Sequence, residues 1–320
     1  MRRVVIAGLA ALALAAQKPE EAPEATIKVD VDVVNLFCSV RDKNKAFIKD
    51  LHRKEFAVYE DGKAQEIRYF TRETDLPLTI GLLVDVSKSQ ENLIEIEKRA
   101  AYQFFQQVLR PKDMAFLVSF GADAELLQDY TNSARSLQKA LNGLRLSTSV
   151  GGLHPGPVPT SKPRGTILFD AIYLAATEKL RSEVGRKVIV VISDGMDFGS
   201  RVSLREAVAE AHKSDTIIYS IYYYDPGAYG FGFGGGSDGD LRKMSEETGG
   251  RLFKVSGRDT LELIFKEIQE EMRSQYAIGY TPSNAVRDGG FRKVEIKLAN
   301  KDYRVQARKG YFAPGPGGSN

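Results

Sequence analysis

Three separate stretches carry oxygen-bearing side chains that could hold a hard cation. In LLVDVSKSQENL, Asp85, Ser87 and Ser89 stand at every second position directly after an apolar run. Thr166 opens the helical pattern of TILFDAIYL, and Asp194 follows the apolar run KVIVVIS. Hydroxyl and carboxylate oxygens are the ligands that Mg²⁺ takes in proteins. The sequence therefore predicts a divalent cation site if these three stretches meet.

The elements around these residues place them at one edge of a sheet. Between about Leu78 and Arg273, short apolar runs alternate with segments of helical period. This alternation predicts a Rossmann-like, doubly wound, mostly parallel sheet with helices on both faces. Ligands bind such sheets beyond the carboxyl ends of the strands, where Asp85 and Asp194 stand.

The segments on either side of this region have strand character. Residues 27–77 and 274–313 alternate apolar and polar residues with period two, and Asp61-Gly62 is a hairpin signal. We expect the two segments to pack into one small antiparallel β unit, with the α/β domain of residues 78–273 inserted between them. Gln65 to Phe70 is predicted to be a single strand. Cys38 lies in an apolar stretch and is predicted to be a buried small hydrophobe.

The two ends of the chain do not read as folded structure. Residues 1–16 have two arginines, an apolar run and small residues before a cleavage point, which predicts a secretory signal peptide and a secreted or periplasmic protein. An uncleaved membrane anchor is the alternative, although the run is shorter than the roughly 20 residues needed to span a bilayer. Residues 17–26 form an acidic linker, and residues 314–320 a tail expected to be disordered. The mature chain is predicted to have no integral membrane segment.

Composition argues against one class of partner. The formal net charge is only +3, so the chain offers no electrostatic case for binding nucleic acid.

The chain resembles a von Willebrand factor type A domain with a metal-ion-dependent adhesion site. That motif consists of D-x-S-x-S on a first loop, a Thr on a second and an Asp on a third. Here it falls on these residues: Asp85, Ser87, Ser89, Thr166 and Asp194. The flanking segments resemble those of secreted acidobacterial proteins with this domain. The resemblance covers about residues 78–273.

The resemblance implies a particular division of roles and a particular ligand. Ser87, Ser89 and Thr166 would bind Mg²⁺ or Mn²⁺ directly, while Asp85 and Asp194 would act mainly through waters. An Asp or Glu carboxylate of a partner protein would take the open position on the ion. The implied function is metal-dependent protein binding in adhesion or assembly, without catalysis.

Several alternatives stay open at this point. Ser87 and Ser89 could instead cap a helix beginning near Gln90, and Asp170 is expected to hold its loop by hydrogen bonds. The chain could also be a regulatory or accessory subunit of a periplasmic enzyme, or a scaffold with a vestigial metal site. Two long Gly/Pro-rich loops, at residues 147–165 and 225–239, are either functional or surface loops without a specific role. In the second loop, three aromatic residues could border the site and contact a partner: Tyr229, Phe231 and Phe233.

Overall fold

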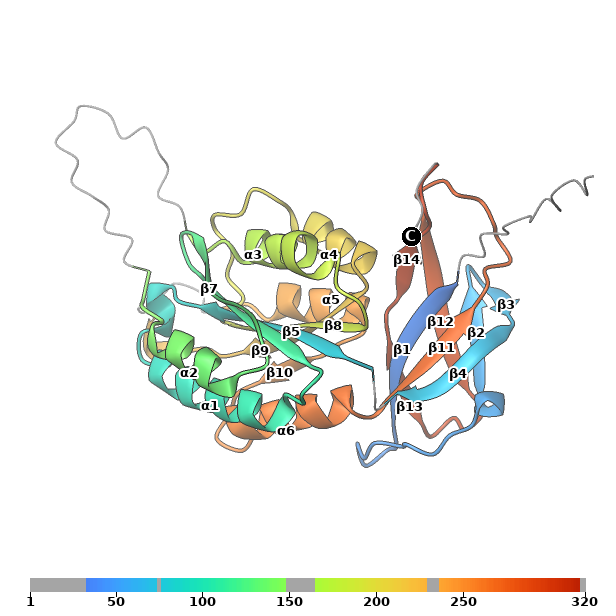
Figure 1. The fold of residues 1–320 in the computed structure, drawn as a ribbon, viewed down its shortest axis with the longest axis horizontal. Helices are drawn as coiled ribbons and strands as arrows, with labels where there is room; N and C mark the ends of the chain where they lie inside the picture. The colour runs from blue at the N-terminus through green and yellow to red at the C-terminus, as the bar shows by residue number, and fades with distance from the viewer. Residues whose placement is uncertain (1–32, 74–75, 148–164, 229–235, 317–320) are drawn as a thin grey trace, which may run out of the picture. The chain divides into compact units, whose positions relative to one another are not determined.

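The centre of the α/β domain is a six-stranded sheet with the strand order β10-β9-β8-β5-β6-β7 (Figure 1). Only the β6–β7 pair is antiparallel. The strands are β5 (Leu78–Asp85), β6 (Met114–Phe120), β7 (Ala124–Thr131), β8 (Arg186–Ser193), β9 (Thr216–Tyr222) and β10 (Leu252–Lys254). This computed structural model describes residues 33–73, 76–147, 165–228 and 236–316.

Helices cover both faces of this sheet (Figure 1). One face carries α1 (Ile94–Val108), α2 (Ala134–Asn142) and α6 (Leu261–Met272). The other carries α3 (Leu168–Leu174), α4 (Leu204–Lys213) and α5 (Gly239–Thr248), with α3 continued by the π-helical segment η3 (Ala175–Leu180). The described ranges also contain three short 3₁₀ helices: η1 (Arg53–Glu55), η2 (Lys88–Gln90) and η4 (Pro226–Ala228).

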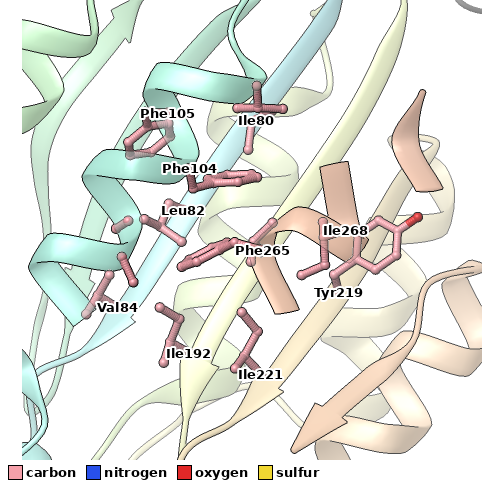
Figure 2. Close-up of a cluster of buried hydrophobic side chains, with 14 of the residues drawn as sticks. Ile80, Leu82, Val84, Phe104, Phe105, Ile192, Tyr219, Ile221, Phe265 and Ile268 are labelled. Carbon is pink, nitrogen blue, oxygen red and sulfur yellow. The ribbon is translucent and has the colours of Figure 1, made fainter. Parts of the chain in front are cut away.

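The core follows from the alternation of side chains along the buried strands. Leu82 and Val84 of β5 face α1 and α6, while Leu83 between them faces α3. Figure 2 shows the first of these layers, where the rings of Phe104 and Phe265 stack with centroids 4.5 Å apart. Every residue of β5 is buried. The strand that ends at Asp85 is therefore held rigidly from both sides.

The segments before and after this domain pair with each other in two antiparallel four-stranded sheets. Their strand orders are β13-β1-β11-β4 and β14-β12-β2-β3. The strands are β1 (Val34–Arg41), β2 (Phe56–Glu60), β3 (Lys63–Gln65), β4 (Ile67–Glu73), β11 (Gln275–Tyr280), β12 (Phe291–Leu298), β13 (Arg304–Ala307) and β14 (Gly310–Phe312). The predicted fold class, a doubly wound sheet inserted in an antiparallel β unit, is confirmed.

The β unit contains a fully buried Cys38, as predicted. It differs from the sequence prediction at one strand. The hairpin turn lies at Asp61 and Gly62, with φ of 46° and 80°, but Gln65 to Phe70 is not one strand. Gln65 pairs with β2 in one sheet and Ile67 pairs with β11 in the other, so the chain changes sheets between them.

A second difference is β7, which the sequence pattern did not predict. Its residues are mostly half-exposed, and its pairing with β6 shifts register twice. A strand at the edge of a sheet with an irregular ladder shows little of the alternation that identifies strands in sequences.

Some sequence predictions fall on residues outside the described ranges. These include the signal peptide of residues 1–16, the linker of residues 17–26, and the aromatic residues Tyr229, Phe231 and Phe233. None of the helices in the described part of the chain has both the length and the apolar character that a membrane crossing requires.

The α/β domain leaves the β unit and returns to it at one place. The buried guanidinium of Arg186 donates hydrogen bonds to the carbonyl oxygens of Leu76, just before β5, and Met272, at the end of α6. The described residues all belong to one compact unit of the chain.

Charged contacts join α6 to β1 beside this place. The carboxylate of Glu271 is fully buried and accepts hydrogen bonds from Ser39 at 2.8 Å, Arg41 at 2.6 Å and Arg251 at 2.8 Å. Because this carboxylate is shielded from water, its two guanidinium partners are needed to offset the cost of burying it.

Candidate metal site

Asp85 lies at the base of the candidate site, at the end of the central strand β5. Its side chain is fully buried. Oδ1 accepts a hydrogen bond from the Ser87 amide at 2.9 Å, and Oδ2 accepts one from the Ser193 hydroxyl at 2.7 Å. Burial, together with the negative charge of Asp194, raises the pKa of the Asp85 carboxyl to about 7. Asp85 therefore shapes the turn that carries the serines. A nearby positive charge would stabilise its ionised form.

The two serines and Asp194 form a continuous chain of polar contacts. Ser87 Oγ and Ser89 Oγ are 2.9 Å apart, and Ser89 Oγ donates a hydrogen bond to Asp194 Oδ2 at 2.6 Å. The contact between Ser89 and Asp194 joins the loop after β5 to the loop after β8. Three of the five predicted ligand residues thus have their side-chain oxygens together at the carboxyl ends of two neighbouring strands.

The structure decides against the helix-cap alternative for the serines. Ser87 is the N-cap position of the short helix η2, but its side chain makes no capping hydrogen bond there. Helix α1 begins at Ile94 and has Leu93 at its N-cap. The serine hydroxyls contact each other and Asp194 instead of the first amides of α1.

Thr166 belongs to a loop that is hydrogen-bonded to the loop of Asp194. Its carbonyl oxygen accepts hydrogen bonds from the amides of Phe198 at 3.0 Å and Gly199 at 3.1 Å. Asp170 holds the same region, as expected, because its Oδ1 accepts from the amides of Arg201 and Val202 at 2.9 and 3.0 Å. The backbone of Thr166 is thus fixed beside the loop that supplies Asp194.

Ser193 and Gly195 are structural residues of the site, and of the two the sequence reasoning did not use Ser193. Ser193 Oγ donates to Asp85 and accepts from the Gly195 amide at 3.0 Å, so it connects two of the loops. Gly195 has φ of +76°, and a Cβ there would lie 1.9 Å from the Ser237 carbonyl oxygen. Only glycine fits this turn, which keeps Asp194 at the end of its strand.

Two buried polar residues lie behind the site, and sequence reasoning missed both. Glu97 of α1 is 1% exposed, and among the described residues neither of its carboxyl oxygens has a hydrogen-bond partner. Burial raises its pKa well above the usual range, and the negative charges of Asp85 and Asp194 raise it further. Gln90 is fully buried, and its amide contacts the Tyr223 carbonyl oxygen at 3.4 Å. A glutamate on the apolar face of a predicted helix is the signal that could have identified Glu97.

An exposed aromatic side chain stands at the rim of the site. Phe198 is 67% exposed, and its amide is hydrogen-bonded to Thr166. A Cβ on Gly165 would lie 2.4 Å from the Cβ of Phe198, so the two backbones are in close contact. The backbone of Phe198 is therefore fixed beside Thr166, and its ring is a large exposed apolar group there.

The donor set consists of oxygen atoms that a divalent cation can bind. Mg²⁺ holds oxygen ligands at about 2.1 Å in octahedral geometry, so neighbouring ligands lie about 3 Å apart. The separation of 2.9 Å between the hydroxyls of Ser87 and Ser89 matches one edge of such an octahedron. Within the described ranges, no three His, Cys, Asp or Glu side chains gather as metal ligands. A cation here would depend on the serine hydroxyls.

The comparisons with known proteins concern the fold. No protein-family model and no curated protein sequence matches the chain. The structure is similar to that of the conserved hypothetical protein BatB from Bacteroides thetaiotaomicron, with 18% identity, a TM-score of 0.47, and 61% of this chain and 97% of that chain covered.

Two further solved structures are similar over comparable lengths of this chain. For the vWF domain of the type V pili tip protein Mfa5 from Porphyromonas gingivalis, the identity is 12%, the TM-score 0.44, and the coverage 62% and 96%. For proximal thread matrix protein 1 from the mussel byssus, with a zinc-occupied MIDAS motif, the values are 16%, 0.47, 67% and 49%. The α/β domain, with five parallel strands, one antiparallel edge strand and helices on both faces, has the type A domain fold that its sequence motif implied.

Proposed function

We propose that this protein is a secreted, metal-dependent binding module that captures an acidic side chain of a partner protein in adhesion or assembly. The observation that carries the proposal is the chain of contacts from Ser87 through Ser89 to Asp194. It brings two neutral hydroxyls and a carboxylate to one point at the rim of the sheet. The proposed ion is Mg²⁺ or Mn²⁺.

The division of roles in this proposal follows from the charge of each group. Ser87 and Ser89 would hold the ion directly, because each hydroxyl oxygen keeps a lone pair for a cation while it takes part in hydrogen bonds. Asp194 would contact the ion through a water and hold Ser89 by its hydrogen bond. Asp85 would hold the turn that carries the serines. With few anionic direct ligands, the bound ion would keep a strong attraction for an incoming carboxylate.

Thr166 is the remaining proposed ligand. Its loop is tied to the loop of Asp194 by the amides of Phe198 and Gly199. A ligand supplied by this loop would therefore be positioned by the same turn that presents Phe198. The exposed Phe198 ring gives a partner an apolar surface next to the place where the partner's acidic side chain would bind.

The proposal assigns binding without turnover. The polar groups at the site are two serines, a threonine and carboxylates that hold the loops. In the described part of the chain, no histidine or lysine that could serve as a base is hydrogen-bonded to these hydroxyls. Secretion rests on the signal-peptide pattern of residues 1–16 in the sequence.

Titration calorimetry with MgCl₂ and MnCl₂ tests the metal site. We expect saturable binding by the natural chain and loss of binding in Ser89→Ala, since that change removes the hydroxyl between Ser87 and Asp194. Ser182→Ala, at an exposed position in the turn before β8, is the matched control and should bind as the natural chain does. Equal metal binding by all three proteins would refute the assignment.

The partner's carboxylate is tested separately with an envelope extract. Immobilised protein should retain a partner in the presence of Mg²⁺ and release it on chelation, while Ser89→Ala should retain none. The bound protein, once identified by mass spectrometry, should lose binding when an exposed Asp or Glu at the contact is changed to its amide. Retention unaffected by chelator and by the Ser89 change would place binding elsewhere on the molecule.

A further inference from the structure

A basic groove runs along the free edge of the β unit, away from the candidate metal site. Its volume is about 650 Å³. The groove is lined by six residues: His52, Arg53, Lys54, Phe70, Thr71 and Arg72. The first three come from η1 and the residue before it, and the other three from β4. Three side chains of fixed positive charge line this groove, and none of its described lining residues is acidic.

The groove follows the outer edge of the strand β4. β4 is the last strand of the sheet β13-β1-β11-β4 and, within the described residues, pairs only with β11. Alternate backbone amides and carbonyls of such a strand point away from the sheet and can receive another strand. The groove therefore combines a row of backbone hydrogen-bonding groups with cationic side chains.

Existing contacts hold the groove in shape and leave part of its charge available. Arg72 donates to the Asp50 carbonyl oxygen at 3.0 Å and lies 3.5 Å from His52 Nδ1. Glu55, which follows Lys54 in the sequence, accepts a hydrogen bond from the His52 amide at 2.7 Å. Neither Arg53 nor Lys54 forms an ion pair with any other described residue, and both are exposed.

Phe70 contributes an apolar surface to the groove. The half-buried Phe70 ring packs against Phe56 and Tyr276, with centroids 5.3 and 5.7 Å apart. An extended peptide has alternate side chains on opposite faces. One face of a bound strand could thus contact Phe70 while the other carries charge.

We propose that the β4 edge binds an acidic, extended peptide segment of another protein by strand addition. The free edge selects a strand, and Arg53, Lys54 and Arg72 select negative charge on it. A second copy of this chain does not suit the same edge, because pairing β4 with β4 would bring two sets of these cations together. This site is independent of the proposed cation and of the function argued from it.

Fluorescence anisotropy of the full chain with a labelled peptide of alternating Glu and Val residues tests the proposal. We expect binding that persists in chelator and weakens strongly between about 0.05 M and about 0.5 M salt. Arg53→Glu combined with Lys54→Glu should weaken it by about tenfold or more. Arg135→Glu combined with Lys139→Glu, an equal charge change on exposed positions of α2, should leave binding unchanged. Equal loss in both double variants would overturn the site.

The backbone part of the proposal has its own test. The same peptide with methyl groups on alternate backbone nitrogens keeps its charge but cannot complete a β-ladder, and it should bind about tenfold more weakly. Hydrogen exchange of amides in residues 67–73 should slow when the unmodified peptide is added. Equal binding of both peptides, or unchanged exchange in β4, would overturn strand addition even if the charge dependence held.

Discussion

Ser89 Oγ donates a hydrogen bond of 2.6 Å to Asp194 Oδ2, and this contact connects the ends of two neighbouring strands of the central sheet. The residues are 105 positions apart in the chain. A cation placed between the two loops would strengthen the same connection, so metal binding and stability should be linked at this point.

Metal binding should raise thermal stability through this connection. We expect the melting temperature to rise with Mg²⁺ concentration, and at 100 times the dissociation constant the folded state should gain about 2.7 kcal/mol. Asp194→Ala should abolish the shift. Differential scanning calorimetry at a series of MgCl₂ concentrations measures the shift in melting temperature relative to the protein in metal-free buffer with chelator. An equal shift in Asp194→Ala would mean that Mg²⁺ stabilises the chain elsewhere.

Glu97 should make stability depend on pH. Burial raises the pKa of its carboxyl in the folded state above the unfolded value of 4.5. Below pH 4.5 the group is neutral in both states, and as pH rises above 4.5 the unfolded state loses its proton first. The free energy of unfolding should therefore fall as pH rises from 4.5 toward the folded pKa.

Glu97→Gln removes this titration and should reduce the pH dependence, while the part due to Asp85, whose pKa is raised to about 7, remains. Urea unfolding of both proteins between pH 5 and pH 8, in chelator, measures the difference in slope, with the exposed Glu246→Gln in α5 as control. The same slope in the natural chain and in Glu97→Gln would show that another group causes it.

Phe198 should affect partner binding without affecting metal binding. Removing an exposed aromatic anchor beside a binding site typically costs about 1–2 kcal/mol of binding free energy. Phe198→Ala should therefore weaken metal-dependent binding of the partner, while Mg²⁺ binding measured by calorimetry stays unchanged. Val184→Ala, at an 85% exposed position, is the control. A loss of Mg²⁺ binding in Phe198→Ala would show that the residue supports the Thr166 loop instead.

Glu271 should be needed for stability. Its fully buried carboxylate faces Arg41 and Arg251, and removing its charge leaves these two guanidinium groups with only the partly exposed Glu267 as an anionic partner. We expect Glu271→Gln to lower the free energy of unfolding by about 3 kcal/mol. Glu262→Gln, at an exposed position of the same helix, should change it little. Chemical denaturation of the three proteins gives the comparison.

The sequence was most informative where side chains are fully buried. β5, β8 and β9 are almost continuously apolar because both faces of the central sheet are covered, and this alone indicates a parallel sheet. β7 escaped prediction because a half-exposed strand with an irregular ladder has no regular pattern. The change of sheet between Gln65 and Ile67 also leaves no trace in the sequence, since both sides of it are strands.

The candidate site also has residues that the sequence predicted and residues that it did not. A spaced motif and the ends of apolar strands were enough to select Asp85, Ser87, Ser89 and Asp194, because parallel strands bring their carboxyl ends to one edge. The hydrogen bonds of Ser193 and the contact of Phe198 with the Thr166 loop depend on tertiary geometry. No local pattern encodes them.

Arg186 holds the carbonyl oxygens of Leu76 and Met272 with a single guanidinium. The inserted domain thus has its two chain ends side by side, and closing the gap left by its removal would cost little loop entropy. A short glycine-serine bridge in place of residues 77–271 would give the β unit as a continuous chain of its own. The same junction would accept a different inserted domain with adjacent ends, while the β unit stayed the same.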